Sequence, residues 1–502
     1  MLSTEKPQVV GMEDMKSSSG YKVGTEHPTD STLRCDRHGL PLVPQPSSDP
    51  MDPLNWNLWL KIMVLMEVSL LSFLALLGAS LITPAFIPLS EFLHRGLVET
   101  AYVASTFVLC AGLSTIVWNP ISNVYGRRPI YIVCVVIGVI MAAASGRAES
   151  YGSLIAFRCL NGFFAGLPLG LGSAVVCDMF FVHERGFYMG IYTVTFITGG
   201  HIAPTIGGYI ANNISWRWCF YVPAILTGAL WLLFVLTVPE TLYSRGAEVI
   251  ARPSRSWIQN MLMVGRAHPT RCLRLIDFLR PFQMLKYPSV LLPALYYAVS
   301  FATGSILFIL SSANLFGRIY HYEPRQTGLL LGIPITIGSL IGETVSGGFS
   351  DWISAKRALF RGQRKPEDRL LAIVPGSVLV PLGVTIEGVC LEYATHWIGV
   401  ALGIVLSSIG LQIVTTVVYT YTAECYKPQS QELGSLLNFI RQIYSFLMGF
   451  YAVPFAELIG VQNAWIVLAM IPVFFSLPII LLFFKGEKWR IKLGLPDFHN
   501  DL

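Results

Sequence analysis

Twelve apolar runs of about 20 residues recur along the chain, and this repeated length constrains the fold more than any other feature. A helix of that length crosses a hydrocarbon core roughly 30 Å thick. The runs are predicted near residues 60–82, 99–118, 129–145, 153–175, 187–210, 217–238, 289–312, 327–349, 370–388, 397–419, 433–455 and 464–484. The expected fold class is an all-α membrane protein with twelve transmembrane helices.

The composition supports a surface that faces lipid. Of the 502 residues, 53% are hydrophobic and 13% are charged, whereas soluble domains have roughly 25% charged residues. A soluble core of this length could not hide so much apolar surface, so the excess is expected to face the bilayer. The nine cysteines form no CxxC pair, so we expect neither a disulfide framework nor a metal site.

A polar stretch, 239–288, divides the spans into two groups of six, because it contains no apolar run long enough to cross a membrane. Two six-span halves joined by a basic loop are typical of parallel repeats related by an axis along the membrane normal. The predicted divisions are a cytoplasmic N-terminal tail, a first half, a cytoplasmic central loop, a second half and a cytoplasmic C-terminal tail: 1–59, 60–238, 239–288, 289–484 and 485–502.

The basic residues predict the orientation. Twelve spans put both termini on one side, and the loops on that side carry 27 lysines and arginines against 5 on the other. Positive residues stay on the cytoplasmic side, so both termini are expected in the cytoplasm. Residues 1–50 hold no early apolar run, so no cleavable signal peptide is expected. The expected location is the plasma membrane, with the vacuolar membrane as the open alternative. The net charge of +5 does not indicate a nucleic-acid partner, because the basic residues lie in loops.

Two related signals occupy equivalent places in the two halves. The stretch 119–129 lies between spans 2 and 3 and ends in Tyr-Gly-Arg-Arg-Pro, while 347–351 (Gly-Gly-Phe-Ser-Asp) follows span 8. Small residues let helices approach closely, and a polar turn with arginines then lies at the membrane face. A duplicated loop of this kind is typical of a membrane transporter.

Six stretches carry a family resemblance: 44–56, 125–129, Arg158 with Gly162 and Gly166, 199–208, 239–243 and 366–370. Together they resemble the fungal branch of the major facilitator superfamily, in particular its twelve-span drug:proton antiporters, over roughly residues 44–490. Six motifs in the family's order argue against a chance match. The resemblance implies the major facilitator fold in two six-helix halves and transport by alternating access. We expect no cofactor and a monomer.

The chain departs from the family pattern at three places. The family loop usually begins with Gly and carries an acidic residue, where this chain has Asn119 and Asn123. The antiporter motif usually has Gly before its proline, where this chain has Ala203. The first change removes a carboxylate expected to pair with nearby arginines, so proton coupling and direction of transport are less firmly implied than the fold.

A cytoplasmic gate is expected at the loop between spans 2 and 3, formed by residues of this loop and by acidic residues that could pair with its arginines. It consists of Gly126, Arg127, Arg128, Asp178 and Asp351. The arginines would hold the bundle by contacts to helix ends and carboxylates; alternatively, they only keep this side in the cytoplasm. Arg185 is expected to pair with Asp178 or Glu184.

The candidates for proton coupling and transport are Glu67, Arg158, Glu343 and Arg441. A desolvated carboxyl can take up and release a proton in the working range, so Glu67 or Glu343 would carry the proton. Either could instead attract a cationic substrate, and Glu343 could equally be a neutral residue bonded to a helix carbonyl.

The two arginines of this set lie inside spans. A charge near the bilayer centre costs about 2.5–3.5 kcal/mol, so Arg158 should face a cavity and have a partner. The resemblance implies that it acts on a nearby carboxylate during proton transfer; the alternative is a snorkelling anchor. Arg441 is expected to pair with an anionic substrate group or with Glu424.

Small and aromatic residues suggest where helices meet and where a cavity lies. Pro204, Gly207 and Gly208 are expected to bend span 5 and let it pack against a neighbour. Similarity implies that this favours export; generic small-residue packing is the alternative. The cavity candidates are Asn161, Tyr296, Tyr297 and Gln412, with a lipid-interface position as the rival interpretation for tyrosines.

Three further positions have simpler interpretations. His201 could titrate near pH 6.5 or could equally be a plain hydrogen-bonding residue, and Glu387 is expected to be solvated near the outer mouth. Asn213 begins an N-glycosylation sequon on an outer loop.

The function that follows is a secondary active transporter, a proton-coupled exporter of a small organic molecule such as a toxin, drug or secondary metabolite. An importer of a polyamine or another cationic solute is the alternative. A membrane-embedded enzyme is disfavoured, because the sequence has no HxxxH or HExxH arrangement, and a primary pump is disfavoured, because it has no GxxxxGK[ST] loop for ATP. A receptor is also disfavoured. The expected partners are the substrate, protons and the lipid bilayer.

Overall fold

The computed structural model of the chain describes residues 42, 44–243, 272–362, 365–426, 429–494 and 496. The chain divides into two units, Met1–Gln45 and Pro46–Leu502. In the first unit, the side-chain amide of Gln45 donates to the carbonyl of Leu42 at 2.8 Å. Most of the predicted N-terminal tail, 244–271 of the predicted central loop and nearly all of the predicted C-terminal tail after 494 lie outside the described residues. The fold described below is that of the second unit.

The described residues before the central loop form a series of helices. They are η2 (Pro53–Asn55), α1 (Leu58–Ser80), η3 (Thr83–Ala85), α2 (Phe86–Leu93), α3 (Leu97–Tyr125), α4 (Arg127–Gly146), α5 (Tyr151–Ala165), α6 (Leu167–Met179), α7 (Val182–Asn213) and α8 (Trp218–Thr237).

The described residues after the central loop are helical as well, and no strand is found in either set. They form α10 (Leu275–Gln283), η5 (Met284–Lys286), α11 (Pro288–Phe301), η6 (Ala302–Ile306), α12 (Leu307–Tyr320), α13 (Pro324–Arg361), η7 (Pro366–Ile373), α14 (Val374–Glu392), α15 (Trp397–Cys425), α16 (Ser430–Ile459) and α17 (Val461–Leu493). The segment η6 is π-helical, so α11, η6 and α12 make one continuous helical passage.

Eleven helical segments within the described residues are long and apolar enough to cross a membrane. The remaining predicted span, 187–210, lies in α7, which is 32 residues long but does not reach the same hydropathy. Its sequence interleaves threonines, glycines and tyrosines with apolar residues. It nevertheless packs along α1 and α13, as the other long helices pack on one another. Each of the twelve predicted passages therefore corresponds to a helical passage in the described part of the chain.

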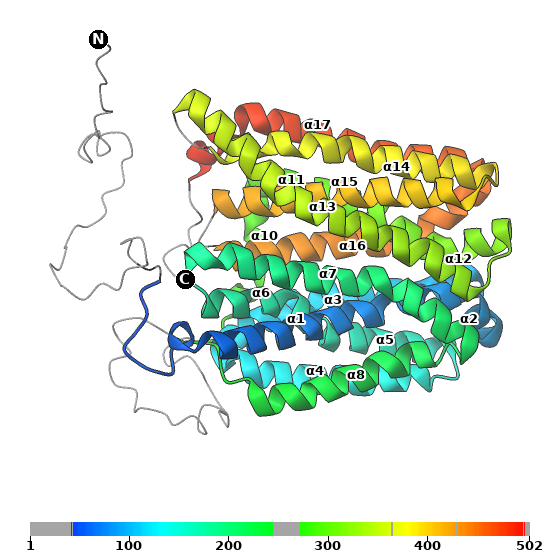
Figure 1. The fold of residues 1–502 in the computed structure, drawn as a ribbon, viewed down its shortest axis with the longest axis horizontal. Coiled ribbons are helices and arrows are strands. Elements are labelled where there is room, and N and C mark those ends of the chain that lie inside the picture. The colour runs from blue at the N-terminus through cyan, green and yellow to red at the C-terminus, as the bar shows by residue number, and fades with distance from the viewer. Residues whose placement is uncertain are drawn as a thin grey trace, which may run out of the picture. The chain divides into compact units, whose positions relative to one another are not determined.

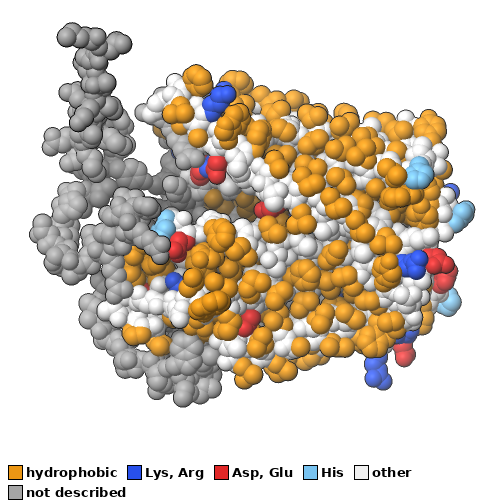
Figure 2. All heavy atoms as spheres, in the orientation of Figure 1, with side chains coloured by type: hydrophobic (Ala, Val, Ile, Leu, Met, Phe, Trp, Pro, Cys, Tyr) orange, Lys and Arg blue, Asp and Glu red, His pale blue; other side chains and the backbone are white. Residues whose placement is uncertain are grey.

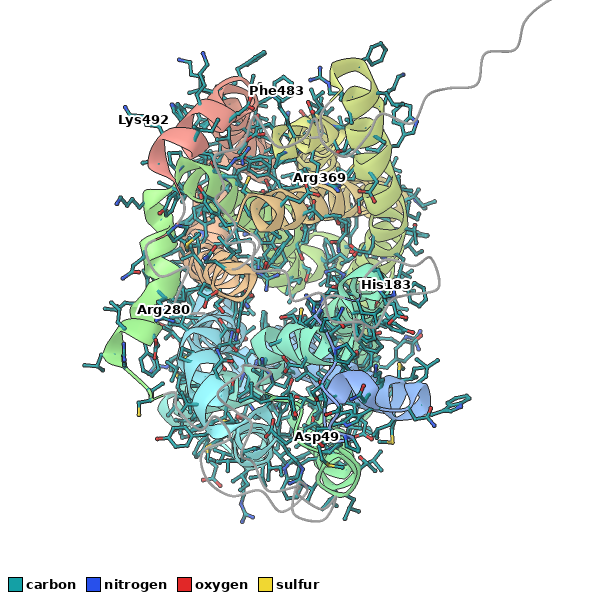
Figure 3. The ribbon with its side chains drawn as sticks, turned by 90° about the vertical axis from the view of Figure 1, so that its left-hand side faces the viewer. Asp49, His183, Arg280, Arg369, Phe483 and Lys492 are labelled. Carbon is teal, nitrogen blue, oxygen red and sulfur yellow. The ribbon has the colours of Figure 1, made fainter. Side chains whose placement is uncertain are left out.

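The helices run side by side between two ends of the second unit (Figure 1). We call the end where α3 and α8 finish and η7 begins the charged end, and the end where α3 begins and α7 finishes the opposite end. Figure 3 looks onto the charged end, where Arg280, Arg369 and Lys492 are labelled. Hydrophobic side chains cover most of the flank between the ends (Figure 2). Leu236 and Phe474, for example, are 75% and 66% exposed, as a surface facing hydrocarbon would require.

One expectation about the loops is wrong. The stretch 347–351 is not a loop, because it lies inside the 38-residue helix α13. That helix ends only at Gly362, which adopts a left-handed conformation with φ of 72°. In the first half, Gly126 has φ of 105° and separates α3 from α4 directly. Glycine stops a helix where it takes up positive φ, and Gly347 and Gly348 do not.

Candidate functional site

A buried charged cluster lies where α3, α4, α6 and α8 meet at the charged end. Glu240 follows α8 and is buried, and its carboxylate accepts hydrogen bonds from the backbone N–H groups of Arg127 at 2.9 Å and Arg128 at 3.1 Å. These N–H groups open α4 and have no partner inside the helix. A carboxylate is favoured at such a helix start because the helix dipole is positive there. Burial raises the pKa of Glu240, while the hydrogen bonds from Leu242, Arg127 and Arg128 oppose the rise.

The side chains of the two arginines reach the other helix ends. Arg127 forms a two-point ion pair with Asp178 on the last turn of α6, and its guanidinium also donates to the amide oxygen of Asn123 at 3.2 Å. Arg128 donates to the carbonyls of Val235 at 2.7 Å and Val238 at 2.6 Å, at the end of α8. Cations are favoured there because the last carbonyls of a helix carry partial negative charge. The structure therefore brings Gly126, Arg127, Arg128 and Asp178 together, and their role as a gate stays a prediction.

A second cluster occupies the corresponding place in the second half. Arg369, in η7, pairs with Asp351 of α13 at 2.7 Å and with Glu424 on the last turn of α15 at 2.8 Å. Asp351 therefore lies in a cluster of its own half. In both clusters an arginine at the start of a span contacts an acid at the end of the next span. Asp351 supplies a second acid beside Arg369. In the first cluster, the corresponding position beside Arg127 is held by Asn123.

Sequence reasoning missed or misassigned several of these residues. Glu424 was expected as a partner of Arg441, which is wrong because it pairs with Arg369. Arg185 was expected to pair with Asp178 or Glu184, but its guanidinium donates to the carbonyl oxygens of Cys177 and Phe180. The roles of Glu240 and Arg369 were not predicted, although both lie in motifs that carried the family resemblance.

A central cavity of about 70 Å³ lies between the two halves. Its lining comes from α1, α3 and α7 on one side and from α11, η6, α12, α15 and α16 on the other. Its polar and aromatic side chains include His201, Tyr297, Phe301, Gln412, Arg441 and Gln442. A drug-sized ligand needs about 300–1,000 Å³, so this cavity must widen to admit one.

Only two of the four predicted cavity residues, Tyr297 and Gln412, line this space. The prediction for Tyr296 is wrong, because its hydroxyl bonds to Ser377 at 2.7 Å, between α11 and α14. Asn161 instead lines a smaller pocket inside the first half, where its side-chain amide donates to the carbonyl of Gly138 at 2.7 Å.

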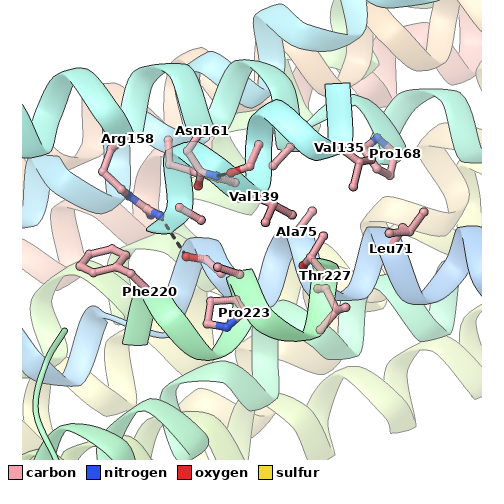
Figure 4. Close-up of a pocket in the computed structure, with 17 residues that line it drawn as sticks. Leu71, Ala75, Val135, Val139, Arg158, Asn161, Pro168, Phe220, Pro223 and Thr227 are labelled. Atoms are coloured by element: carbon pink, nitrogen blue, oxygen red, sulfur yellow. Dashed lines mark hydrogen bonds between the residues drawn. The ribbon is translucent and has the colours of Figure 1, made fainter. Parts of the chain in front are cut away.

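Arg158 lines that same smaller pocket (Figure 4). Its guanidinium donates to the carbonyls of Val103, Gly78 and Ala79 at 3.0–3.1 Å. It also lies over the rings of Phe107 and Phe220. Among the described residues no carboxylate forms an ion pair with Arg158, so its partners are helix carbonyls rather than the expected acid.

The two candidate proton carriers lie outside the lining of the central cavity. Glu67 in α1 is buried, and both its carboxylate oxygens accept from the Thr237 hydroxyl, at 2.8 and 3.0 Å. Glu343 in α13 is half-buried, and its Oε2 has no hydrogen-bond partner among the described residues.

Glu387 was expected to be solvated, which is wrong. Its side chain is buried between α14 and α17, where the indole of Trp465 donates to its Oε2 at 2.9 Å. No local pattern indicated this contact, because Trp465 lies in another span.

The predicted small-residue motif of α7 contacts α13 and η3 at the opposite end. A Cβ on Gly208 would lie 2.4 Å from the carbonyl oxygen of Pro324, and one on Gly328 would lie 2.2 Å from that of Pro204. A Cβ on Gly207 would lie 1.9 Å from the carbonyl oxygen of Leu81. The helices are therefore in backbone contact at this end.

The same two helices have free space toward the charged end. A Cβ on Gly186 or Gly190 of α7, or on Gly347 or Gly348 of α13, would meet no atom within 4 Å. These four glycines mediate no close contact, so the close backbone contact through glycine between α7 and α13 lies at the opposite end. Asn213 ends α7 there and is exposed.

Comparison with known proteins gives consistent results. The model of the Major Facilitator Superfamily matches residues 68–452. The chain is 29% identical to the "MFS-type transporter penM" of Penicillium rubens over 88% of each chain. It is 28% identical to the "Efflux pump radE" of Floropilus chiversii over 88% of this chain and 83% of that protein. A bacterial homologue of the human lysosomal transporter Spinster, solved in an inward-facing and unoccupied conformation, superposes with a TM-score of 0.61 at 15% identity, over 88% of this chain and all of that one.

Proposed function

Because this chain belongs to the major facilitator superfamily, we propose that it exports a small organic molecule in exchange for protons. The family makes it an integral, multi-pass membrane transporter and not an enzyme. Export is supported by relatives that are named efflux pumps. A plasma-membrane location with both termini in the cytoplasm is part of the proposal, and it rests on the excess of basic residues on the terminal side. We also propose that the protein is a monomer and that Asn213 is glycosylated.

The observation that carries the mechanism is the uneven contact between α7 and α13. These helices touch through glycines at the opposite end and have free space beside the glycines nearer the charged end. A central cavity lined by both halves lies beside α7. One-sided closure between α7 and α13 is what alternating access would require of one state, while α3 and α16 still join the halves near the charged end. The two charged clusters would then act as the cytoplasmic gate, each tying helix ends within its half.

We propose Glu343 as the proton carrier in preference to Glu67. Its helix forms part of the contact between the halves, and one of its oxygens has no described partner. Glu67 bonds to Thr237 inside the first half and would stabilise α1 against α8. Arg158 would likewise hold α1 and α3 against α5 through three carbonyls.

The function is tested by the accumulation of an amphipathic fluorescent dye in cells with and without the protein. Export predicts that deletion raises accumulation and that a protonophore removes the difference. A fall on deletion would instead indicate import, the outcome expected of a polyamine-like carrier.

The proton site is tested by Glu343→Gln, with Glu67→Gln as the matched control. Glu343→Gln is expected to abolish export driven by a proton gradient in proteoliposomes while energy-independent exchange of substrate continues. Glu67→Gln is expected to keep both activities. Gradient-driven export by Glu343→Gln at the wild-type rate would rule out this assignment.

A further inference from the structure

We propose that Arg441 binds the carboxylate of an amphipathic organic anion in the central cavity. This rests on the proposed transport function and adds the substrate class. It differs from the cationic substrate that an acidic cavity would select.

Arg441 is a buried charge without an acidic partner. It is 9% exposed on α16, and its guanidinium donates to the hydroxyl of Tyr297 at 3.2 Å and the amide oxygen of Asn438 at 2.6 Å. Its Nε has no hydrogen-bond partner among the described residues, and no described carboxylate forms an ion pair with it. A buried cation with neutral partners and a spare donor is unfavourable unless a ligand completes it.

Arg158 provides an internal comparison. It is also fully buried, but each of its three nitrogens donates to a backbone carbonyl. Every guanidinium nitrogen of Arg158 therefore has a partner. Arg441 lines the central cavity, and its Nε has no hydrogen-bond partner among the described residues.

The neighbouring groups favour an anion as well. His201, 7% exposed, lines the same cavity from the other half of the chain, and its Nδ1 has no described partner. The side-chain amides of Gln412 and Gln442 add further donors. None of the described residues that line the cavity is acidic. A guanidinium matches a carboxylate in two-point geometry.

The rest of the lining requires an apolar body on the ligand. The ring of Phe301 lies 4.3 Å from the Arg441 guanidinium carbon, and Leu76, Ile197 and Ile306 complete apolar walls. The combination of one cationic centre, amide donors and aromatic faces fits an amphipathic acid rather than a small inorganic anion.

The test uses three naphthalene probes of similar shape: 2-naphthoate, 2-naphthamide and 2-naphthylmethylammonium. Thermal unfolding of the purified full-length protein is followed as each probe is added. The carboxylate should stabilise the wild type at concentrations roughly 10–100-fold lower than the amide, because one charged hydrogen-bonded pair is lost in the amide. The ammonium should have no effect.

Variants separate a binding role from a structural one. Arg441→Gln should remove the preference for carboxylate over amide, and Arg441→Lys should restore part of it. Arg217→Gln is the matched control, because Arg217 stacks on Phe92 and Trp216 outside the cavity. It should keep the wild-type preference. If Arg441→Gln does not fold, the probe series on the wild type and on Arg441→Lys still tests whether Arg441 binds the carboxylate.

Equal stabilisation by the three probes, no stabilisation by the carboxylate, or an unchanged preference in Arg441→Gln would overturn the inference. Failure of the proposed function has a different outcome. A wild-type protein that prefers the carboxylate but shows no proton-driven export would contradict export alone, whereas proton-driven export of the ammonium without carboxylate preference would contradict this inference alone.

Discussion

At the residue scale, both charged clusters pair arginine with acidic residues, but the acidic side chains differ in how far they are exposed. Arg127 and Asp178 have side chains that are 6% and 19% exposed, whereas Asp351, beside Arg369, is 64% exposed. A charge left alone in a buried pair costs several kcal/mol, but an exposed pair contributes little. The first cluster should therefore matter more for stability.

Asp178→Asn is expected to destabilise the protein by about 3 kcal/mol, because it leaves the buried Arg127 charge without its acid. Asp351→Asn is the matched control and should cost less than about 1 kcal/mol, because Asp351 is exposed and Arg369 keeps Glu424. Thermal unfolding of the two purified variants checks this. Equal losses would show that depth does not separate the clusters.

Glu240 gives a pH dependence with a defined sign. Burial raises its pKa above the ordinary glutamate value of 4.5, so the folded protein binds this proton more tightly than the unfolded chain. Its contribution to stability is then fully present below pH 4.5 and is lost as the pH rises through the raised pKa. Glu240→Gln, which cannot titrate, is expected to lack this loss. Melting temperatures measured against pH for both proteins test it, and superimposable profiles would refute it.

At the element scale, the contact between α7 and α13 is set by the absence of side chains. A methyl at Gly328 would lie 2.2 Å from a backbone carbonyl, which cannot move without shifting α7. A methyl at Gly347 of the same helix meets nothing. The helix α13 thus contains both a glycine whose substitution should disturb packing, Gly328, and a glycine that serves as the control, Gly347.

Gly328→Ala is expected to destabilise the closed contact by about 1–3 kcal/mol through overpacking, and to slow export. Gly347→Ala should leave the closed contact of this state intact and stabilise α13 by up to about 1 kcal/mol through helix propensity. Dye export and thermal unfolding of both variants are the measurements. Similar behaviour of the two would mean that the glycine contact is not needed for closure.

Helix positions were predictable because apolar runs are a local property of the sequence. The predicted start of the tenth span, 397, is where α15 begins, and the break between α3 and α4 at Gly126 falls inside the predicted loop 119–129, although α3 continues to Tyr125. The prediction of a second loop at 347–351 was wrong, because Gly347 and Gly348 allow a helix to continue as readily as they allow it to stop. Local patterns do not show which backbone angle a glycine adopts.

The site was less predictable, because its contacts join segments that are distant in sequence. Arg127 and Arg128 carried a visible pattern, but nothing local linked Arg369 to Glu424. Glu387 lies near the end of its span, which suggested solvent, but a tryptophan of another span covers it. Of the cavity candidates, Tyr296 and Tyr297 are adjacent and point to different helices, a difference that depends on helix rotation.

At the scale of the whole molecule, α3 and α16 join the two halves near the charged end. The side-chain amide of Asn119 donates to the Ser435 hydroxyl at 2.7 Å across this boundary. Ser346 and Thr416 make a similar bond of 2.9 Å, but within the second half. The first contact must break if the halves separate there, and the second need not.

A disulfide engineered across this boundary, by Asn119→Cys with Ser435→Cys in a background without native cysteines, is expected to stop transport. Reduction should restore it. The control pair Ser346→Cys with Thr416→Cys should transport whether oxidised or reduced, because it ties helices of one half. Proteoliposome flux before and after reductant measures both, and flux through the oxidised first pair would contradict rocking of the halves at this boundary.

The π-helical turn η6 forms part of the wall of the central cavity. It lies between Tyr297 and Phe301 on α11 and Ile309 on α12, all of which line the same space. A π turn holds one residue more than the α-helical turn it interrupts. Removing one residue from 302–306 would therefore convert the π turn into an α-helical one and leave α11 and α12 facing nearly as they do now. A deletion within this turn should thus preserve the side chains presented to the cavity, whereas a deletion elsewhere in the passage would turn α12 by about 100° and exchange them.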